Sequence, residues 1–158
     1  MSEQRGSEAP ACEVWFYHLE RTGLDQALPE LLEKTLQKGW KAIVRSSASE
    51  RVDHLDGWLW SYRDESFLPH APADEPNPER QPILLTTRTD NPNRADALFL
   101  VDGAEAGDLA GYQRCIVIFD GADDGQLQNA RAQFRDAKAK GFPVSYWKQQ
   151  ARGWEKTA

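Results

Sequence analysis

Short runs of apolar and β-branched residues alternate with longer segments of helical periodicity along most of the chain. This alternation is typical of an α/β protein with a mainly parallel central sheet. We predict strands over residues 13–19, 40–45, 83–87, 97–101 and 115–119, and helices over 24–38, 49–60 and 124–140. Because there is no internal repeat and no second apolar core, we expect a single domain.

The remaining segments contain the helix and strand breakers. Residues 69–82 hold five of the nine prolines, which predicts a long surface loop without regular structure. Pro143 precedes the apolar run 144–147, so we expect at most a short or edge strand there. We assign residues 1–12 to a disordered N-terminal segment, 13–148 to the α/β domain and 149–158 to a polar C-terminal tail.

The charge of the chain is divided unevenly. The 158 residues contain 19 Lys and Arg against 25 Asp and Glu, a net charge of −6. Residues 126–158 carry seven bases and two acids, or +5, which leaves −11 for residues 1–125. An acidic body argues against strong direct DNA binding. The basic part either marks the docking place of an anionic partner or is a solvated helix face.

Cysteine content and hydropathy favour a cytoplasmic protein. Cys12 and Cys115 are too few for a disulfide framework and lie beside apolar runs, which suggests reduced core thiols, with a disulfide between them as the alternative. The apolar runs reach about half a dozen residues, far below the roughly 18–20 that a membrane span needs. We therefore expect neither membrane association nor export.

The sequence lacks the common enzyme signatures. The turn after the first strand, residues 20–23, has one glycine and no Lys-Ser/Thr pair, which weighs against a nucleotide site. His18, His54 and His70 have no metal-ligand spacing, and we expect core, surface and loop roles for them. We predict no cofactor.

One acidic cluster supports an alternative function. Asp120, Asp123 and Asp124 follow the strand 115–119, and ligands of parallel sheets bind beyond the carboxyl ends of strands. These carboxylates could hold Mg²⁺ in a metal-dependent phosphoryl-transfer enzyme. The competing interpretation, which we favour, is that Asp123 or Asp124 caps the following helix and offsets its dipole.

The last predicted helix has an apolar stripe bordered by bases. A projection at about 100° per residue places the stripe on one face and the bases directly beside it, with Phe134 at the seam. The stripe is Leu127, Ala130, Phe134 and Ala137, and the bases are Arg131, Arg135 and Lys138. Such a row can bind a ligand that ends in a carboxylate and carries an aromatic side chain. Alternatively, the basic side chains only cover the rim of the core.

Aromatic residues gather before the proline-rich segment. They are Trp58, Trp60, Tyr62 and Phe67. One helix cannot bury both tryptophans, because positions two residues apart lie about 200° apart. At least one is therefore expected to be exposed as an interface anchor, unless the loop folds back over it. The sequence does not decide between these alternatives.

Several short motifs follow one another along the chain. They are Trp15-Phe16-Tyr17-His18-Leu19, Leu31-Leu32-Glu33-Lys34 with Gly39, Leu55-Asp56 with Leu59-Trp60, Ser66-Phe67-Leu68-Pro69-His70, Pro82-Ile83, Ile118-Phe119-Asp120, Ala130-Arg131 with Phe134, Gly141-Phe142 and Tyr146-Trp147-Lys148. In their order and spacing, over about residues 13–148, they resemble one protein family, the chi subunit of bacterial DNA polymerase III.

The resemblance implies a fold and a function. Chi-like proteins have a Rossmann-like three-layer α/β/α fold without a nucleotide-binding loop. They are non-catalytic adaptors of the clamp-loader complex and bind the acidic, Phe-ending C-terminal tail of single-stranded DNA-binding protein (SSB). A separate surface binds the psi subunit. A repair helicase is the alternative partner for that second surface.

The resemblance also implies residue roles. Arg131 would hold the terminal carboxylate of the SSB tail, with Phe134, Arg135 and Lys138 flanking it and Phe119 and Asp120 near the pocket floor. The psi-facing surface would include Trp60, Phe67, Pro69 and His70. The chain departs from the family pattern at Phe134, where Tyr is frequent. It also has Asp123, Asp124 and Gln126 where some members are basic, which would weaken tail binding.

Overall fold

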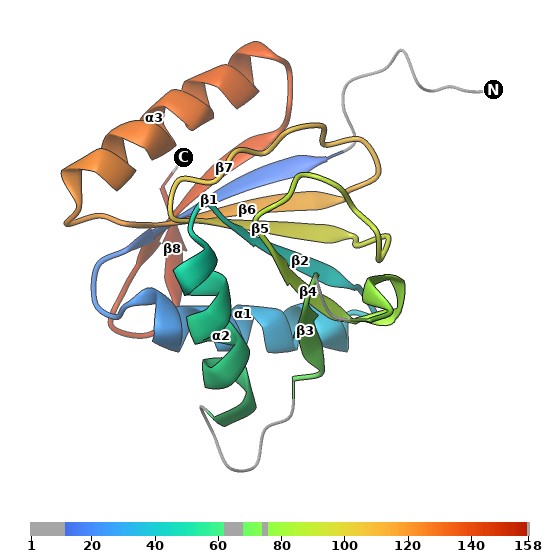
Figure 1. Cartoon of the computed structure of the whole chain (residues 1–158). Coiled ribbons are helices and arrows are strands. Elements are labelled where there is room, and N and C mark those ends of the chain that lie inside the picture. Colours follow the sequence, from blue (N-terminus) through green and yellow to red (C-terminus); the bar gives the residue numbers. More distant parts are fainter. Residues whose placement is uncertain (1–11, 62–67, 74–75, 158) are drawn as a thin grey trace.

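The computed structural model describes residues 12–61, 68–73 and 76–157 (Figure 1). Within them the chain forms β1 (Glu13–Leu19), α1 (Leu24–Gln37), β2 (Ala42–Ser46), α2 (Ser49–Ser61), β3 (His70–Pro72), the 3₁₀ helix η1 (Pro78–Arg80), β4 (Ile83–Thr86), β5 (Ala97–Val101), β6 (Arg114–Asp120), α3 (Asp124–Ala139), β7 (Val144–Gln149) and β8 (Trp154–Lys156). The helices and strands predicted from periodicity agree with these bounds to within two residues.

The strands form one open sheet in the order β3-β4-β2-β5-β6-β1-β7-β8. All neighbouring pairs are parallel except β7 and β8, which are antiparallel. Helices α1 and α2 cover one face of the sheet, and α3 covers the other (Figure 1). The predicted three-layer α/β fold with a mainly parallel sheet is therefore confirmed.

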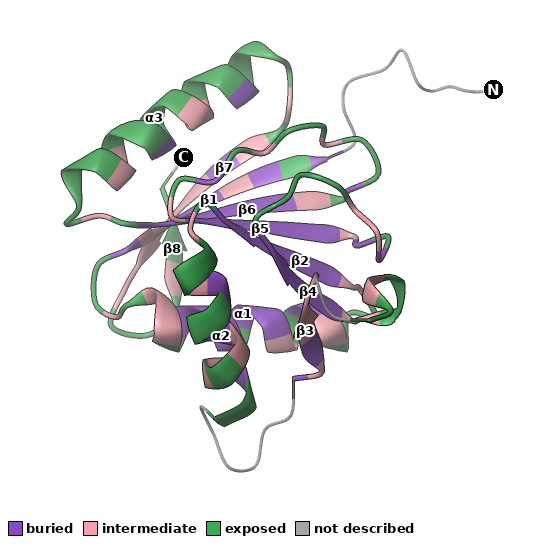
Figure 2. Ribbon diagram, in the orientation of Figure 1, coloured by how far each residue is buried: buried purple, intermediate pink, exposed green. Residues whose placement is uncertain are grey.

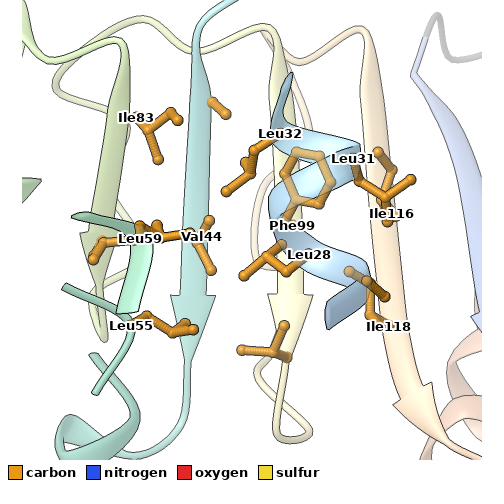
Figure 3. Close-up of a cluster of buried hydrophobic side chains, with 14 of the residues drawn as sticks. Leu28, Leu31, Leu32, Val44, Leu55, Leu59, Ile83, Phe99, Ile116 and Ile118 are labelled. Atoms are coloured by element: carbon orange, nitrogen blue, oxygen red, sulfur yellow. The ribbon is translucent and has the colours of Figure 1, made fainter. Parts of the chain in front are cut away.

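The α1–α2 face contains the larger leucine-rich core. Leu28 and Leu32 of α1 and Leu59 of α2 are fully buried against Val44 and Phe99 of the central strands (Figure 3). Each fully buried side chain of this size contributes about 1.5–3 kcal/mol to folding. The buried strands lie between the two helical layers in Figure 2. This core explains why these strands are mostly apolar.

Pro29 lies inside α1, beyond the first turn in which a proline is readily accommodated. It cannot donate the helical hydrogen bond to the carbonyl of Asp25, four residues earlier. The indole N–H of Trp58 on α2 donates to that carbonyl instead, at 2.6 Å. The proline therefore leaves an acceptor that joins α1 to α2.

The α3 face is covered more thinly. Only Ala130 and Ala137 of α3 are buried, and the connection between β5 and β6 adds Ala104 and Tyr112. Arg45 of β2 lies under this connection with 1% of its surface exposed. Its guanidinium donates to the backbone carbonyls of Arg88 at 2.7 Å, Ala106 at 2.8 Å and Glu105 at 3.1 Å. A buried arginine thus holds the loops after β4 and β5 to the sheet.

Two predictions around prolines are wrong. The segment 69–82 is not wholly irregular, because His70–Pro72 forms β3 and Pro78–Arg80 forms η1. β3 pairs only with β4, and a proline without an N–H is tolerated on such an edge strand. β7 is neither short nor at an edge, since it has six residues between β1 and β8. Pro143 precedes the strand, and its carbonyl accepts from Val14 N at 2.9 Å.

The ends of the domain also differ from the predicted boundaries. The segment 149–158, expected to be a polar tail, contains β8, whose Trp154 stacks on Tyr17 with ring centroids 4.5 Å apart. Cys12, expected to belong to the N-terminal segment, is buried, and residues 1–11 lie outside the described residues. Cys12 and Cys115 are both free and buried, as the preferred interpretation predicted. No described helix has the length and apolar character to cross a membrane.

Candidate functional site

The structure places the predicted basic row on the outer surface of α3. Ala130 and Ala137 face the sheet, whereas Arg131, Arg135 and Lys138 are exposed, so the helical projection is confirmed. Among the residues that the structure describes, no carboxylate forms an ion pair with these three bases. By contrast, Lys140 pairs with Asp136 of the same helix at 3.1 Å. The row therefore presents cations that are available to an anionic ligand.

Phe134 connects this row to an aromatic floor. Its half-buried ring packs edge-on against Phe16 of β1, with centroids 5.3 Å apart, and against Tyr146 of β7 at 6.2 Å. Phe119 of β6 is buried and lies 6.0 Å from Tyr146, again edge-on. An incoming aromatic ring would find partners here in the edge-to-face geometry that such rings prefer.

A polar group on β1 and β7 extends the floor. The register pairs His18 with Lys148, and both side chains point to the α3 face because strand residues alternate between faces. The Nδ1 atom of His18 lies 2.5 Å from the hydroxyl of Tyr146. Glu20 lies 3.7 Å from Nε2 of His18 and 3.6 Å from Nζ of Lys148. These contacts add a cation and a hydrogen-bonded ring to the site.

The charge of Arg131 affects the pKa values of His18 and Tyr146. Burial lowers the pKa of His18, with Lys148 and Arg131 adding to the lowering and Glu20 and Asp120 opposing it. Burial likewise raises the pKa of Tyr146, and the charge of Arg131 opposes that rise. The charge of Arg131 therefore acts on both rings. We call Arg131, Phe134, Arg135, Lys138 and Tyr146 the α3–β7 surface.

Gly121 lies directly against the ring of His18. A Cβ atom built on Gly121 would lie 1.9 Å from Nε2 of His18, which no real side chain tolerates. The absence of a side chain at Gly121 is what lets the imidazole occupy its place beside Phe119 and Tyr146.

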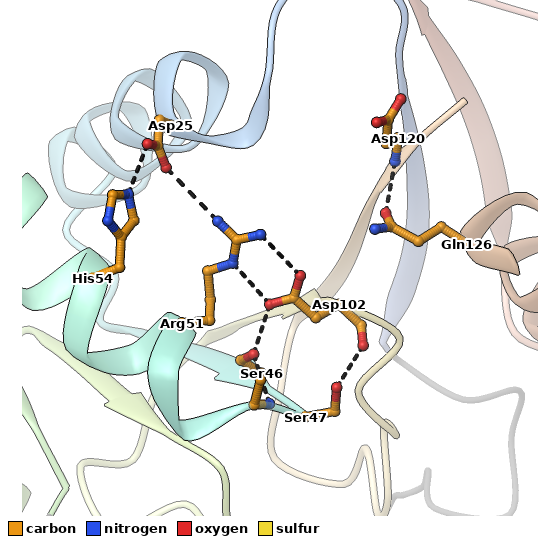
Figure 4. Close-up of polar contacts among 9 residues, drawn as sticks. Asp25, Ser46, Ser47, Arg51, His54, Asp102, Asp120 and Gln126 are labelled. Atoms are coloured by element: carbon orange, nitrogen blue, oxygen red, sulfur yellow. Dashed lines mark hydrogen bonds and ion pairs between the residues drawn. The ribbon is translucent and has the colours of Figure 1, made fainter. Parts of the chain in front are cut away.

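The side chain of Asp120 leaves β6 on the face opposite the aromatic rings of the site. Asp120 follows Phe119 at the end of β6, and successive strand residues point to opposite faces. Its N–H donates to Oε1 of Gln126 at 2.8 Å (Figure 4). Its carboxylate accepts from Ala122 N at 2.9 Å. It borders a crevice of about 300 Å³ that Arg51, Asp102 and Phe119 also line. Asp120 and Phe119 therefore border one crevice, although their side chains leave β6 on opposite faces.

A second candidate surface lies where α2 meets β3. Trp60 is 49% exposed, and its ring lies 4.2 Å from that of the buried His70. Trp58 is the partly buried tryptophan, which resolves the alternative that the sequence left open. His70 is held by the carbonyls of Leu68 and Asp56.

Of the residues predicted for this surface, the structure brings Trp60 and His70 together. Pro69 lies half-buried beside His70. Phe67 lies outside the described residues. We call Trp60, Pro69 and His70 the α2–β3 surface.

Comparison with known proteins decides the family. The family model for the DNA polymerase III chi subunit, HolC, matches residues 12–145. The chain belongs to the DNA polymerase III chi subunit family. A probable DNA polymerase III subunit chi from Rickettsia prowazekii is 26% identical over 103 residues, which cover 65% of this chain and 62% of that protein, less than two thirds of its length. The DNA polymerase III subunit chi of Pseudomonas aeruginosa is 28% identical over 121 residues, covering 75% of this chain and 82% of that protein.

Membership in the chi family rests on the match over residues 12–145. It gives context to the acidic cluster. In this chi-family chain, Asp123 is the N-cap of α3 and its Oδ1 accepts from Gln126 N at 3.0 Å, which confirms the capping interpretation. In the described part of the chain, no three acidic, histidine or cysteine side chains are arranged to hold a metal ion. Among the described residues, Asp120, Asp123 and Asp124 do not form such a group.

Sequence reasoning did not place His18, Tyr146 or Lys148 beside the basic row of α3. His18 was expected to have a core role, Tyr146 was part of a predicted short strand, and Lys148 was only counted among the C-terminal bases. Their period-two spacing puts each on a definite face of its strand. The missing information was the parallel pairing of β1 with β7, which joins segments about 130 residues apart.

Proposed function

We propose that this chi-family protein is a non-catalytic adaptor of the DNA polymerase III clamp-loader complex. Its α3–β7 surface would bind the acidic, Phe-ending C-terminal tail of SSB. Its α2–β3 surface would bind the psi subunit or an equivalent clamp-loader or helicase partner. The observation that carries the proposal is the row of three bases without acidic partners beside the half-buried Phe134.

The roles of the residues follow from their chemistry. The guanidinium of Arg131 suits a terminal carboxylate, because it offers two parallel N–H donors to the two oxygens. The ring of a terminal phenylalanine would pack against Phe134 and Tyr146, above the buried Phe119. Arg135 and Lys138 would attract the acidic residues that precede the terminal phenylalanine in the SSB tail.

The charge distribution along α3 supports one direction for the tail. Asp123 and Asp124 stand at the start of the helix, and Arg135 and Lys138 in its second half. Acidic residues of the peptide would be repelled by the first pair and attracted by the second. The body of the tail is therefore expected to run from Arg131 towards Lys138, away from the start of α3.

Peptide binding tests the proposal directly. A peptide with the SSB tail sequence, titrated calorimetrically, should bind at about micromolar strength and more weakly as salt is added. Arg131→Ala should lower the affinity about ten- to a hundredfold, since one charge-assisted contact contributes about 1.5–3 kcal/mol. Lys140→Ala is the matched control, because Lys140 already pairs with Asp136. A C-terminally amidated peptide should bind like the Arg131 variant, and undiminished binding by Arg131→Ala would refute the site.

The second surface is tested by capture of partners. Large aromatic anchors dominate the energy of many interfaces, and Trp60 is such an anchor at the edge of the sheet. A pull-down from the native cell extract with Trp60→Ala beside the unchanged protein should lose psi or the equivalent partner. Asp53→Ala, an exposed change elsewhere on α2, is the control and should keep it. Equal capture of that partner by all three proteins would contradict the assignment.

The proposal also covers contact with DNA. With −11 in residues 1–125, the body of the protein should repel a phosphate backbone, so DNA would be reached through SSB rather than directly. We further expect a cytoplasmic location and no membrane contact.

A further inference from the structure

Three successive backbone N–H groups in the β1–α1 loop converge on a single oxygen. Glu20 N, Arg21 N and Thr22 N lie 3.0, 2.7 and 3.0 Å from Oε1 of Gln149, the last residue of β7. The Nε2 of the same side chain donates to Oγ1 of Thr22 at 2.7 Å. One carboxamide is therefore held by four hydrogen bonds to a loop about 130 residues away in sequence.

The place of this loop in the fold is informative. It follows the carboxyl end of β1 and leads into α1, which is where open parallel α/β sheets bind the phosphate of a ligand. Consecutive N–H groups pointing to one spot form a concavity of positive potential that suits an anion. A neutral amide oxygen carries less negative charge than a carboxylate or phosphate oxygen. The loop therefore holds a weaker acceptor than its geometry can bind.

Space for a larger group lies beside the amide. A cavity of about 510 Å³ is bordered by Thr22 and Gln149, and it lies between α1 and the β7–β8 turn. Its wall carries two bases, Arg21 and Lys34, and two acids, Asp25 and Glu30. Because these charges balance, selection for an anion depends on the three N–H groups of the loop rather than on the cavity wall.

We propose that residues 20–22 form an oxyanion cradle and that Gln149 is its built-in occupant. The β7–β8 hairpin is then held to β1 by a contact that a carboxylate or phosphate group can replace. This inference is separate from the adaptor function. In this arrangement, the side chain of Gln149 occupies the kind of place at which parallel α/β sheets bind a ligand phosphate.

The substitution Gln149→Glu distinguishes an oxyanion cradle from simple packing of an amide. A carboxylate in the cradle accepts three N–H bonds, which favour its charged form and lower the pKa of the new group. The variant should therefore unfold at a temperature equal to or above that of the unchanged protein at pH 7. The stability of the variant relative to the unchanged protein should be lost as the pH falls below about 4.3, the usual pKa of a glutamate side chain.

The exposed change Gln128→Glu adds the same charge elsewhere and is the control. It should show no comparable loss of relative stability with acid. The proposal is overturned if Gln149→Glu lowers the unfolding temperature at pH 7 and recovers it on acidification, because that behaviour indicates a site built for a neutral group.

The substitution Gln149→Ala tests whether an external anion can take the vacated position. In this variant, inorganic phosphate should shift the amide NMR signals of Glu20, Arg21 and Thr22 in a saturable manner, whereas sodium chloride at equal ionic strength should not. The unchanged protein should show no such shift, because its cradle is occupied. Unmoved signals in a variant whose remaining spectrum is native would count against the cradle.

Discussion

The contact between Gly121 and His18 makes a sharp prediction for stability. In Gly121→Ala, the new Cβ would lie 1.9, 2.4 and 2.9 Å from Nε2, Cδ2 and Cε1 of the imidazole. Gly121 N donates to the carbonyl of Leu19 at 3.0 Å, so the backbone is tied to β1. The ring is therefore the part that must move.

The cost follows from what the ring gives up. Leaving its place breaks the hydrogen bond to Tyr146, which contributes about 0.5–1.5 kcal/mol. It also removes the contact with Phe119, at 5.0 Å between centroids, which contributes a further amount of about 0.5–1.5 kcal/mol. We expect Gly121→Ala to lower the free energy of unfolding by about 1–3 kcal/mol. Each kcal/mol corresponds to roughly 2–4 °C in Tm for a chain of this size.

Urea denaturation of a double-mutant cycle measures this cost. In a His18→Ala background the clash is absent, so adding Gly121→Ala should cost almost nothing. Gly57→Ala in α2 is the control, because a Cβ there meets nothing within 4 Å, and the change should raise stability by about 0.5–1 kcal/mol. Additive effects of the His18 and Gly121 changes, or a Gly121→Ala variant as stable as the unchanged protein, would refute the reasoning.

Two further predictions concern buried ionisable groups. Arg45→Met should lower the free energy of unfolding by about 2–4 kcal/mol in urea denaturation, because it leaves three backbone carbonyls without their donor. A variant as stable as the unchanged protein would show that water replaces the guanidinium. Since burial lowers the pKa of His18, the folded chain binds fewer protons than the unfolded chain below about pH 6.5, and stability should fall from pH 7 to pH 5. His18→Gln should flatten this part of the pH profile, and an unchanged slope would assign it to other groups.

Sequence reasoning recovered the elements whose pattern is local. Apolar runs predicted β2, β4, β5 and β6, because strands buried on both faces are mostly apolar. Sequence reasoning failed for strands whose existence depends on pairing with a neighbouring strand. β3 and β8 have three residues each and exist because β4 and β7 offer them free edges. No local pattern in a proline-rich or polar segment reports the presence of such an edge.

In the candidate site too, the sequence predicted what lies on one helix but not what strand pairing brings together. Arg131 and Phe134 share one helix, so a projection was enough to place a base beside an aromatic ring. His18 and Tyr146 join that site only through the strand order β1-β7 and the crossover of α3. The close approach of Gly121 to His18 depends on tertiary packing, and in the sequence this glycine resembles any turn residue that follows a strand.

The strand order also sets the separation between the two candidate surfaces. Trp60 and His70 border β3, and Arg131 and Phe134 border β7, six inter-strand spacings away in the sheet. At about 4.8 Å per spacing this is roughly 29 Å. The helices that carry the surfaces, α2 and α3, lie on opposite faces (Figure 1). A protein docked on one surface would therefore leave the other uncovered. The number of strands between the two surfaces fixes the distance that a single copy of the domain can span.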